Sequence, residues 1–162
     1  MHVRSQTRSS WQHEGDMMDK NMQPGIMIRA IHQVRCAFDK QQGKASKIKN
    51  YFAFDYAFEL VSENKGQAEL TLKAKGTNAD DSTEVYNCEI VYIGVFEVVK
   101  GSANMPLGEF LGTNAPAHLL PYIRESLSSL SQKAGLPAIL LPPINILALL
   151  SAKMPKAPDK ED

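Results

Sequence analysis

The sequence of 162 residues predicts an α+β fold, in which a four-stranded antiparallel sheet precedes a long C-terminal helix and a short lid helix. Apolar residues alternate with a period of two in four segments before residue 100, and they take helical spacing only after residue 118. Strands followed by helices are typical of this class. We expect one domain over residues 25–152, between disordered tails at 1–24 and 153–162.

The first predicted strand begins at Ile26 and has one apolar face. That face contains Ile26, Ile28, Ala30, Val34, Cys36 and Phe38. His32 interrupts it, and a single histidine in a strand is more often a hydrogen-bonded core residue than a base or a metal ligand. The polar segment 39–50 is long for a hairpin turn, so we expect it to be a crossover loop.

The next two predicted strands alternate more regularly. In "YFAFDYAFEL" one face holds Phe52, Phe54, Tyr56, Phe58 and Leu60. The strand after the turn "SENKGQ" has Ala68, Leu70, Leu72 and Ala74 on one face. The short link predicts that these two strands are antiparallel neighbours.

The fourth predicted strand, "EVYNCEIVYIGVFEVV", is apolar on both faces in its second half. A strand of an antiparallel sheet usually keeps one face in water. We therefore expect this strand to be covered on both sides, by a helix and by another subunit.

The long helix is predicted from apolar residues at alternating steps of three and four. These residues are Leu120, Ile123, Leu127, Leu130 and Ala134. We place the start between His118 and Pro121, because proline is tolerated in a first turn, and the end at Gly135. The serines of "SLSSLS" are interpreted as its polar surface. The short helix is predicted after Pro143.

Composition excludes several function classes. Lysine plus arginine equals aspartate plus glutamate, 18 against 18, so we expect no nucleic-acid partner. Cys36 and Cys88 have no neighbouring Cys or His at metal-ligand spacing, which predicts two buried thiols and no metal. "GKAS" lacks the Ser or Thr that binds magnesium in a phosphate loop, because Ala45 stands there, so we expect no nucleotide and no other cofactor.

The chain is predicted to be cytoplasmic, because its N-terminus has no apolar run of signal-peptide length. The apolar segment 136–150 is shorter than the roughly 20 residues of a spanning helix and contains three prolines, so we expect no membrane insertion. Met17, Met18 and Met22 leave the true start methionine open.

The apolar segments exceed what one small domain needs to bury. The surplus fits an oligomer interface, a groove for exposed hydrophobic segments of other proteins, or both. In a groove, the aromatic row of the second strand would form one wall and "LLPPINILALL" a movable lid. The predicted client-binding residues are Phe52, Phe54, Tyr56, Phe58, Leu141, Ile144, Ile146, Leu147 and Leu150.

Two other functions stay open. His118 at a helix start is a candidate base in a small α+β enzyme or ligand-binding domain of the thioesterase type, although no nucleophile lies near it in sequence. A purely structural oligomeric scaffold would bury all of its apolar faces.

Three stretches resemble the SecB chaperones: "CEIVYIGVFEV", the helix start "NAPAHLLPYIRESLSSL" and the proline-hinged "LPPINILALL". The resemblance covers residues 26–152 and includes Pro121, Tyr122, Arg124 and Glu125. It implies a non-enzymatic, ATP-independent holdase that binds non-native polypeptides and assembles as a homotetramer, a dimer of dimers. We expect the interface to use Tyr86, Cys88, Ile90, Tyr92, Leu120, Ile123, Leu127 and Leu130.

The resemblance leaves the client open between preproteins for export and an aggregation-prone antitoxin of a toxin–antitoxin pair. Export members of the family pass clients to the SecA motor through an acidic sheet face, for which Glu89 is the candidate residue here. Because this chain is neutral overall, we favour the antitoxin role slightly.

Overall fold

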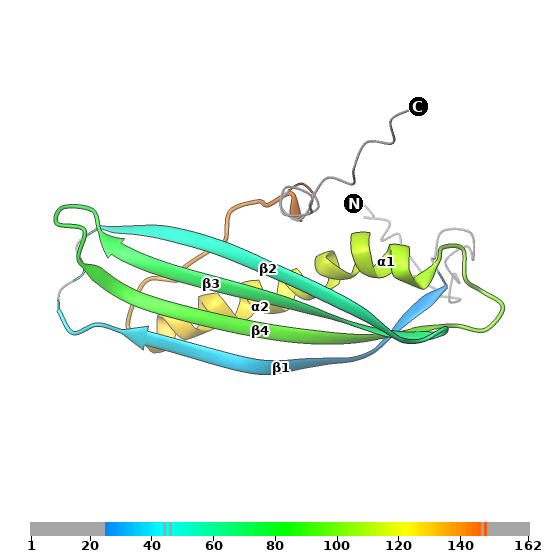
Figure 1. Cartoon of the computed structure of the whole chain (residues 1–162). Helices are drawn as coiled ribbons and strands as arrows, with labels where there is room; N and C mark the ends of the chain where they lie inside the picture. Colours follow the sequence, from blue (N-terminus) through cyan, green and yellow to red (C-terminus); the bar gives the residue numbers. More distant parts are fainter. Residues whose placement is uncertain (1–24, 44, 46, 147, 149–162) are drawn as a thin grey trace, which may run out of the picture.

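A computed structural model describes residues 25–43, 45, 47–146 and 148. Its elements are β1 (Ile26–Lys40), β2 (Ile48–Ser62), β3 (Lys65–Asn78), β4 (Glu84–Val98), α1 (Leu107–Thr113) and α2 (Ala115–Lys133). The strands form one antiparallel sheet in the order β1-β4-β3-β2, and α2 runs along one face of it (Figure 1). The predicted α+β fold with its long helix is confirmed.

The link between β1 and β2 crosses one end of the sheet. These strands are consecutive in sequence but lie at opposite edges, so the predicted crossover is confirmed. The β2 and β3 strands are antiparallel neighbours, as the short link between them predicts, with Phe54 paired to Leu72. The face of β2 that carries Phe54 is therefore continuous with the apolar face of β3.

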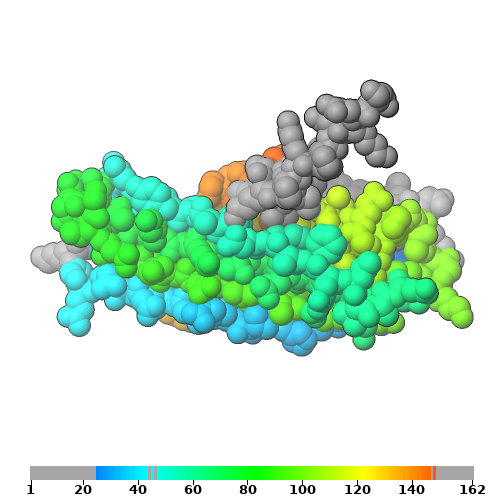
Figure 2. All heavy atoms as spheres, viewed as in Figure 1, coloured from blue at the N-terminus to red at the C-terminus, as the bar shows by residue number. Residues whose placement is uncertain are grey.

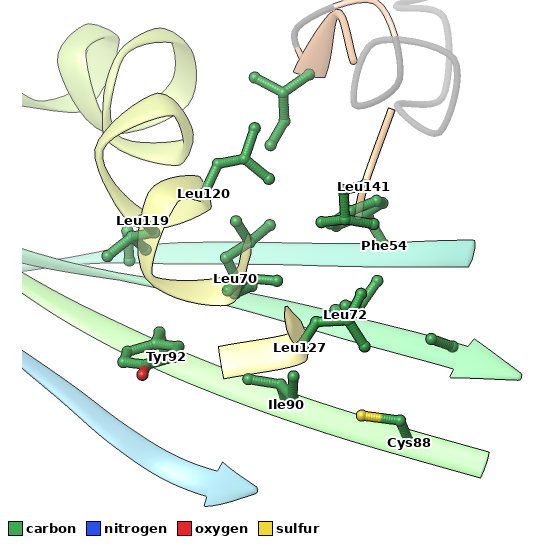
Figure 3. Close-up of a cluster of buried hydrophobic side chains, with 14 of the residues drawn as sticks. Phe54, Leu70, Leu72, Cys88, Ile90, Tyr92, Leu119, Leu120, Leu127 and Leu141 are labelled. Atoms are coloured by element: carbon green, nitrogen blue, oxygen red, sulfur yellow. The ribbon is translucent and has the colours of Figure 1, made fainter. Parts of the chain in front are cut away.

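The core lies between the sheet and the two helices. Leu70, Leu72 and Ile90 on the sheet meet Leu127 of α2 in one buried cluster (Figure 3). Within the described residues both helices pack on this inner face, and the strands themselves form the surface of the outer face (Figure 2). The helices of the same chain therefore bury the inner face of the sheet.

The predicted oligomer interface stays a prediction, because the structure describes a single chain. Within that chain its residues are already buried or half-buried between the sheet and α2. The residues concerned are Tyr86, Cys88, Ile90, Tyr92, Leu120, Ile123, Leu127 and Leu130. A narrow apolar seam on a helix looks the same whether its partner surface is its own sheet or another subunit.

Two predictions about β1 are wrong. Cys36 and His32 are exposed, although both were expected to be buried. β1 is an edge strand, and register shifts between Ile28 and Ala30 and between Gln33 and Arg35 interrupt its alternation. Each extra residue moves the following side chains to the other face, so His32 pairs with Ile93 on the outer side of the sheet.

The long helix begins earlier than predicted. It starts at Ala115 with Pro116 in its first turn, and Pro121 lies inside it. Pro121 lacks the N–H that would bond the carbonyl of Ala117, a residue exposed to water. Both prolines fit the sequence rule for a first turn, and only packing selected the earlier one.

The end of α2 is as predicted. Gly135 has φ +77°, and the N–H groups of Gly135 and Leu136 donate to the carbonyls of Gln132 and Ser131. This is a Schellman cap, and Leu136 is buried after it. Of the predicted short helix, Ile146 and Ala148 are helical. Leu147, Leu149 and Leu150 lie outside the described residues.

Candidate functional site

A groove lies between the crossover loop, the start of β2 and the segment that follows α2. Its volume is about 470 Å³. The lining residues are Lys40, Gly43, Ala45, Ile48, Asn50, Gly135, Leu136, Pro137, Ala138, Ile139 and Leu140. No carboxylate is among them, so the groove combines an apolar wall with one cation and one amide.

The floor beneath this end of the groove is one row of residues across the sheet. Strand register aligns Lys40, Tyr86, Gly76 and Asn50. The Tyr86 ring lies over Gly76, where an added Cβ would come within 2.2 Å of a ring carbon, and its hydroxyl donates to Asn50 Oδ1 at 2.8 Å. Phe38 stacks on the same ring, with centroids 5.1 Å apart. Glycine is therefore required where the tyrosine crosses the strand.

The opposite wall, the segment 136–142, is tied to α2 at three places. The Schellman cap fixes its beginning. The Ser131 hydroxyl then accepts a hydrogen bond of 2.9 Å from the backbone N–H of Ile139. Finally, Arg124 donates to the carbonyls of Leu141 and Pro142 at 3.3 and 3.2 Å. These hydrogen bonds hold in place an extended segment that does not pair with a strand.

The prediction that the serines of "SLSSLS" form a polar surface is wrong for Ser126 and Ser131, because both are buried. Ser126 Oγ lies 2.8 Å from the Tyr92 hydroxyl and accepts from Gln33 Nε2 at 3.0 Å. Serine at these positions satisfies buried donors and acceptors. No spacing in the sequence distinguishes such a serine from a solvated one.

The aromatic row of β2 is largely covered by the chain itself. Phe54, Leu141 and Ile146 are buried in one cluster, in which Phe54 and Leu141 appear together in Figure 3. Phe52, Tyr56 and Ile144 are half-buried against it. The predicted open wall is therefore closed at Phe54, because the segment that was predicted to be a lid packs on it.

An apolar surface remains open at the far end of β2. Phe58, Leu60 and Val61 are exposed by 40, 56 and 60%, and Leu140 at the groove is exposed by 73%. The short helix α1 packs beside this end, with Gly112 against the Phe58 ring. The Tyr56 hydroxyl donates to the carbonyl of Leu111, which fixes α1 to the strand.

The ionisable groups near the core favour packing over acid–base chemistry. Burial raises the pKa of the Cys88 thiol to about 12, and burial likewise raises the pKa of Tyr86 to about 12. Both groups therefore stay neutral at ordinary pH. The His118 ring packs against Phe96 and Phe110, with centroids 6.4 and 5.8 Å away, so its described ring contacts are with aromatic carbon.

Glu89, the predicted SecA contact, lies on the outer face of the sheet. Its carboxylate forms an ion pair with Arg35 at 2.6 Å, and Lys73 is its partner in register on β3. The ion pair with Arg35 offsets the negative charge of Glu89, which an acidic SecA-binding surface would need.

The described part of the chain contains neither a cluster of metal-binding side chains nor a membrane-spanning helix. Those residues contain no group of three or more His, Cys, Asp or Glu that would hold a metal ion. None of the described helices has the length and apolar character to cross a bilayer.

Comparison with known proteins gives one consistent family. The sequence model of the family described as "Preprotein translocase subunit SecB" matches residues 21–157. The Protein-export protein SecB of Hahella chejuensis is 35% identical, over 78% of this chain and 81% of that protein. The protein of the same name from Alkalilimnicola ehrlichii is 33% identical over 60% of this chain, and the match spans only 51% of that relative.

A solved structure shares the fold. The Mycobacterium tuberculosis Rv1957 SecB-like chaperone, in complex with a ChAD peptide from the Rv1956 HigA1 antitoxin, superposes with a TM-score of 0.61. The comparison covers 74% of this chain and 91% of that one at 18% identity, so it is evidence for the fold alone.

Proposed function

The chain belongs to the SecB family, and from that membership we propose that it is an ATP-independent holdase for non-native polypeptides. The groove beside the crossover loop is its client site. The observation that carries the proposal is that this groove of about 470 Å³ is lined by Ile48, Leu136, Ile139 and the 73%-exposed Leu140. Leu140 gives this concavity an exposed apolar wall, which suits segments that share hydrophobicity rather than sequence.

The energetics suit holding rather than folding. Burying one aliphatic client side chain contributes roughly 1.5–3 kcal/mol, so one groove binds weakly. Several grooves on an oligomer that engage one client raise its avidity without tight local contacts. Binding the unfolded chain then draws it away from aggregation by mass action, and no nucleotide is needed.

The closed cluster around Phe54 gives the site a second state. Segment 136–142 is held by Ser131, Arg124 and the Schellman cap, and its apolar residues contact the aromatic row. When the Arg124 bonds break, the row of Phe52, Phe54, Tyr56 and Phe58 becomes the extension of the groove towards exposed Leu60 and Val61. The predicted lid is therefore proposed to be closed in the client-free chain.

The client is a preprotein or an antitoxin. The relatives are named for protein export, and the solved neighbour holds an antitoxin peptide. For an export role we propose that SecA contacts the open sheet face at Glu89, where it must compete with Arg35. Co-purification of client from a strain that expresses the tagged chain, followed by mass spectrometry, separates the two roles.

The working form is proposed to be a cytoplasmic homotetramer built as a dimer of dimers. Support comes from β1, an edge strand of 15 residues on which Met27, Ile28 and Val34 are exposed. A long edge of unpaired backbone groups is a template on which a strand of another subunit can pair.

The test is suppression of aggregation of an unfolded client without ATP. Leu140→Asp should weaken suppression and raise the client Kd about tenfold, because a charge replaces an exposed apolar wall residue. Tyr51→Asp is the matched control, since Tyr51 is 50% exposed but pairs with Lys75 on the outer face. Equal suppression by wild type and Leu140→Asp would contradict the groove as client site.

A further inference from the structure

One cation stands at the mouth of the groove. Lys40 is the last residue of β1 and projects from the inner face, in the same row as Tyr86. A Cβ built on Gly135 would lie 3.9 Å from Lys40 Nζ, so the ammonium group sits at the point where α2 ends and the apolar wall begins. It therefore adjoins the wall that a client would contact.

This ammonium has no anionic partner in the described residues. Among the residues that the structure describes, no ion pair involves Lys40 and no carboxylate lines the groove. The adjoining hollow beyond Gly43 does contain Asp81 and Glu84. Asp81 accepts hydrogen bonds from Thr83, and Glu84 accepts one from Gln41, so both carboxylates are engaged on the far side of the loop.

Capping of α2 does not account for Lys40. The carbonyls of Ser131 and Gln132 already accept from backbone N–H groups, and Lys133 supplies a positive charge in the last turn. A second donor faces the same space, because Asn50 uses its carbonyl oxygen for Tyr86 while its NH₂ group has no partner among the described residues. As far as the described residues line it, the groove therefore offers hydrogen-bond donors and no carboxylate.

We propose that Lys40 makes this groove selective for client segments in which an acidic side chain flanks apolar ones. The inference rests on the proposed holdase function and names the client chemistry of the same site. Apolar client residues contact the exposed Leu140 and the half-buried Ile48, while the client carboxylate pairs with Lys40 Nζ and accepts a hydrogen bond from the Asn50 amide. Clients whose flanking residues are basic bind more weakly, because two ammonium groups repel at the groove mouth.

The expected preference is modest. Exposed ion pairs change affinity by a few-fold, and a partly desolvated one by somewhat more. We expect a peptide with aspartate to bind about fivefold tighter than its lysine counterpart at low salt, and the difference to shrink at high salt.

The experiment uses the full-length chain and two fluorescein-labelled peptides of about ten residues, leucine-rich and identical except for one aspartate or lysine. Fluorescence anisotropy gives the ratio of the two Kd values. The ratio should fall to about one in Lys40→Gln and should invert in Lys40→Glu. Lys49→Gln is the matched control, because Lys49 is one residue from Ile48 but pairs with Thr77 on the outer face, and it should keep the wild-type preference.

Each other outcome overturns the inference. Equal binding of both peptides by the wild type refutes the selectivity and leaves the holdase function standing. A preference that survives in Lys40→Glu assigns it to another residue. Failure of both peptides to bind the wild type refutes the groove as client site and the inference with it. Thermal melting of each variant checks that the fold is intact.

Discussion

Gly76 lies at a position in β3 where the Tyr86 ring leaves no room for a side chain. A Cβ at this position would meet Tyr86 ring carbons at 2.2 and 2.6 Å and a methyl of Ile48 at 2.8 Å. We predict that Gly76→Ala destabilises the chain by about 1–3 kcal/mol, because the ring must shift and its bond to Asn50 breaks. Urea unfolding at neutral pH measures the change.

Gly108→Ala provides the control for that substitution. Its nearest atom would be a Leu60 methyl at 3.8 Å, an ordinary contact, and alanine has the higher helix propensity. Stability should be unchanged or rise slightly. If both glycine variants lose equal stability, close approach of Tyr86 is not the cause.

Alkaline pH should destabilise the fold through two buried groups. Burial raises the pKa of Cys88 from 9.0 to about 12 and the pKa of Tyr86 from 10.0 to about 12. Below about pH 9 both groups are neutral in both states, and above it the unfolded chain ionises first. The free energy of unfolding should fall steadily between about pH 9 and 12, as followed by urea titration. The fall of unfolding free energy with pH should be less steep in Cys88→Ala. An unchanged slope would show that this thiol does not contribute to the alkaline destabilisation.

Single-residue expectations failed where burial depends on a neighbour that is distant in sequence. Cys36 was expected to be buried because its strand alternates, yet β1 lies at the sheet edge. Ser131 was expected to be exposed because it is polar, yet it accepts the N–H of Ile139. The alternation of a strand gives its two faces, but which face is covered depends on other elements.

At the scale of elements, α2 and the segment after it behave as one unit joined by side chains. Ser131 supplies the acceptor for the buried N–H of Ile139. We predict that Ser131→Ala destabilises the chain by about 1–3 kcal/mol, because that N–H loses its partner. It should also increase hydrogen exchange at Ile139 and Leu141.

Ser129 offers a matched comparison on the same helix. It is half-buried, and its side chain forms no hydrogen bond within the described residues. Ser129→Ala should change stability by less than about 0.5 kcal/mol. If both serine variants lost similar stability, the loss would come from replacing a serine on the helix and not from the hydrogen bond to Ile139.

Elements were predicted best where their periodicity was strong. All four strands and the body of α2 follow from alternation and three-four spacing. The helix α1 was not predicted, because seven residues with glycines at 108 and 112 have little intrinsic helicity. It forms because Leu107, Phe110 and Leu111 are buried and Gly112 fits against Phe58.

At the scale of the whole molecule, the free edge of β1 should set the oligomeric state. We predict that Ile28→Lys combined with Val34→Lys lowers the mass measured by light scattering after gel filtration, since lysines on an edge oppose strand pairing. Glu69→Lys, which is exposed on the inner strand β3 rather than at an edge, should leave the mass unchanged. A double variant that keeps the wild-type mass would place the subunit contact elsewhere.

The sequence by itself determined the strands, the long helix, its glycine cap and the family, because these depend on periodicity and on short motifs. It also indicated an apolar surplus around "LLPPINILALL". Only the tertiary structure decided which apolar faces the chain covers for itself: α2 seals the sheet residues that were expected at an interface, and segment 136–142 closes over Phe54. It alone brought Lys40 from β1 to Gly135 at the end of α2. The physical reason is that burial and charge pairing depend on groups distant in sequence, whereas periodicity is local.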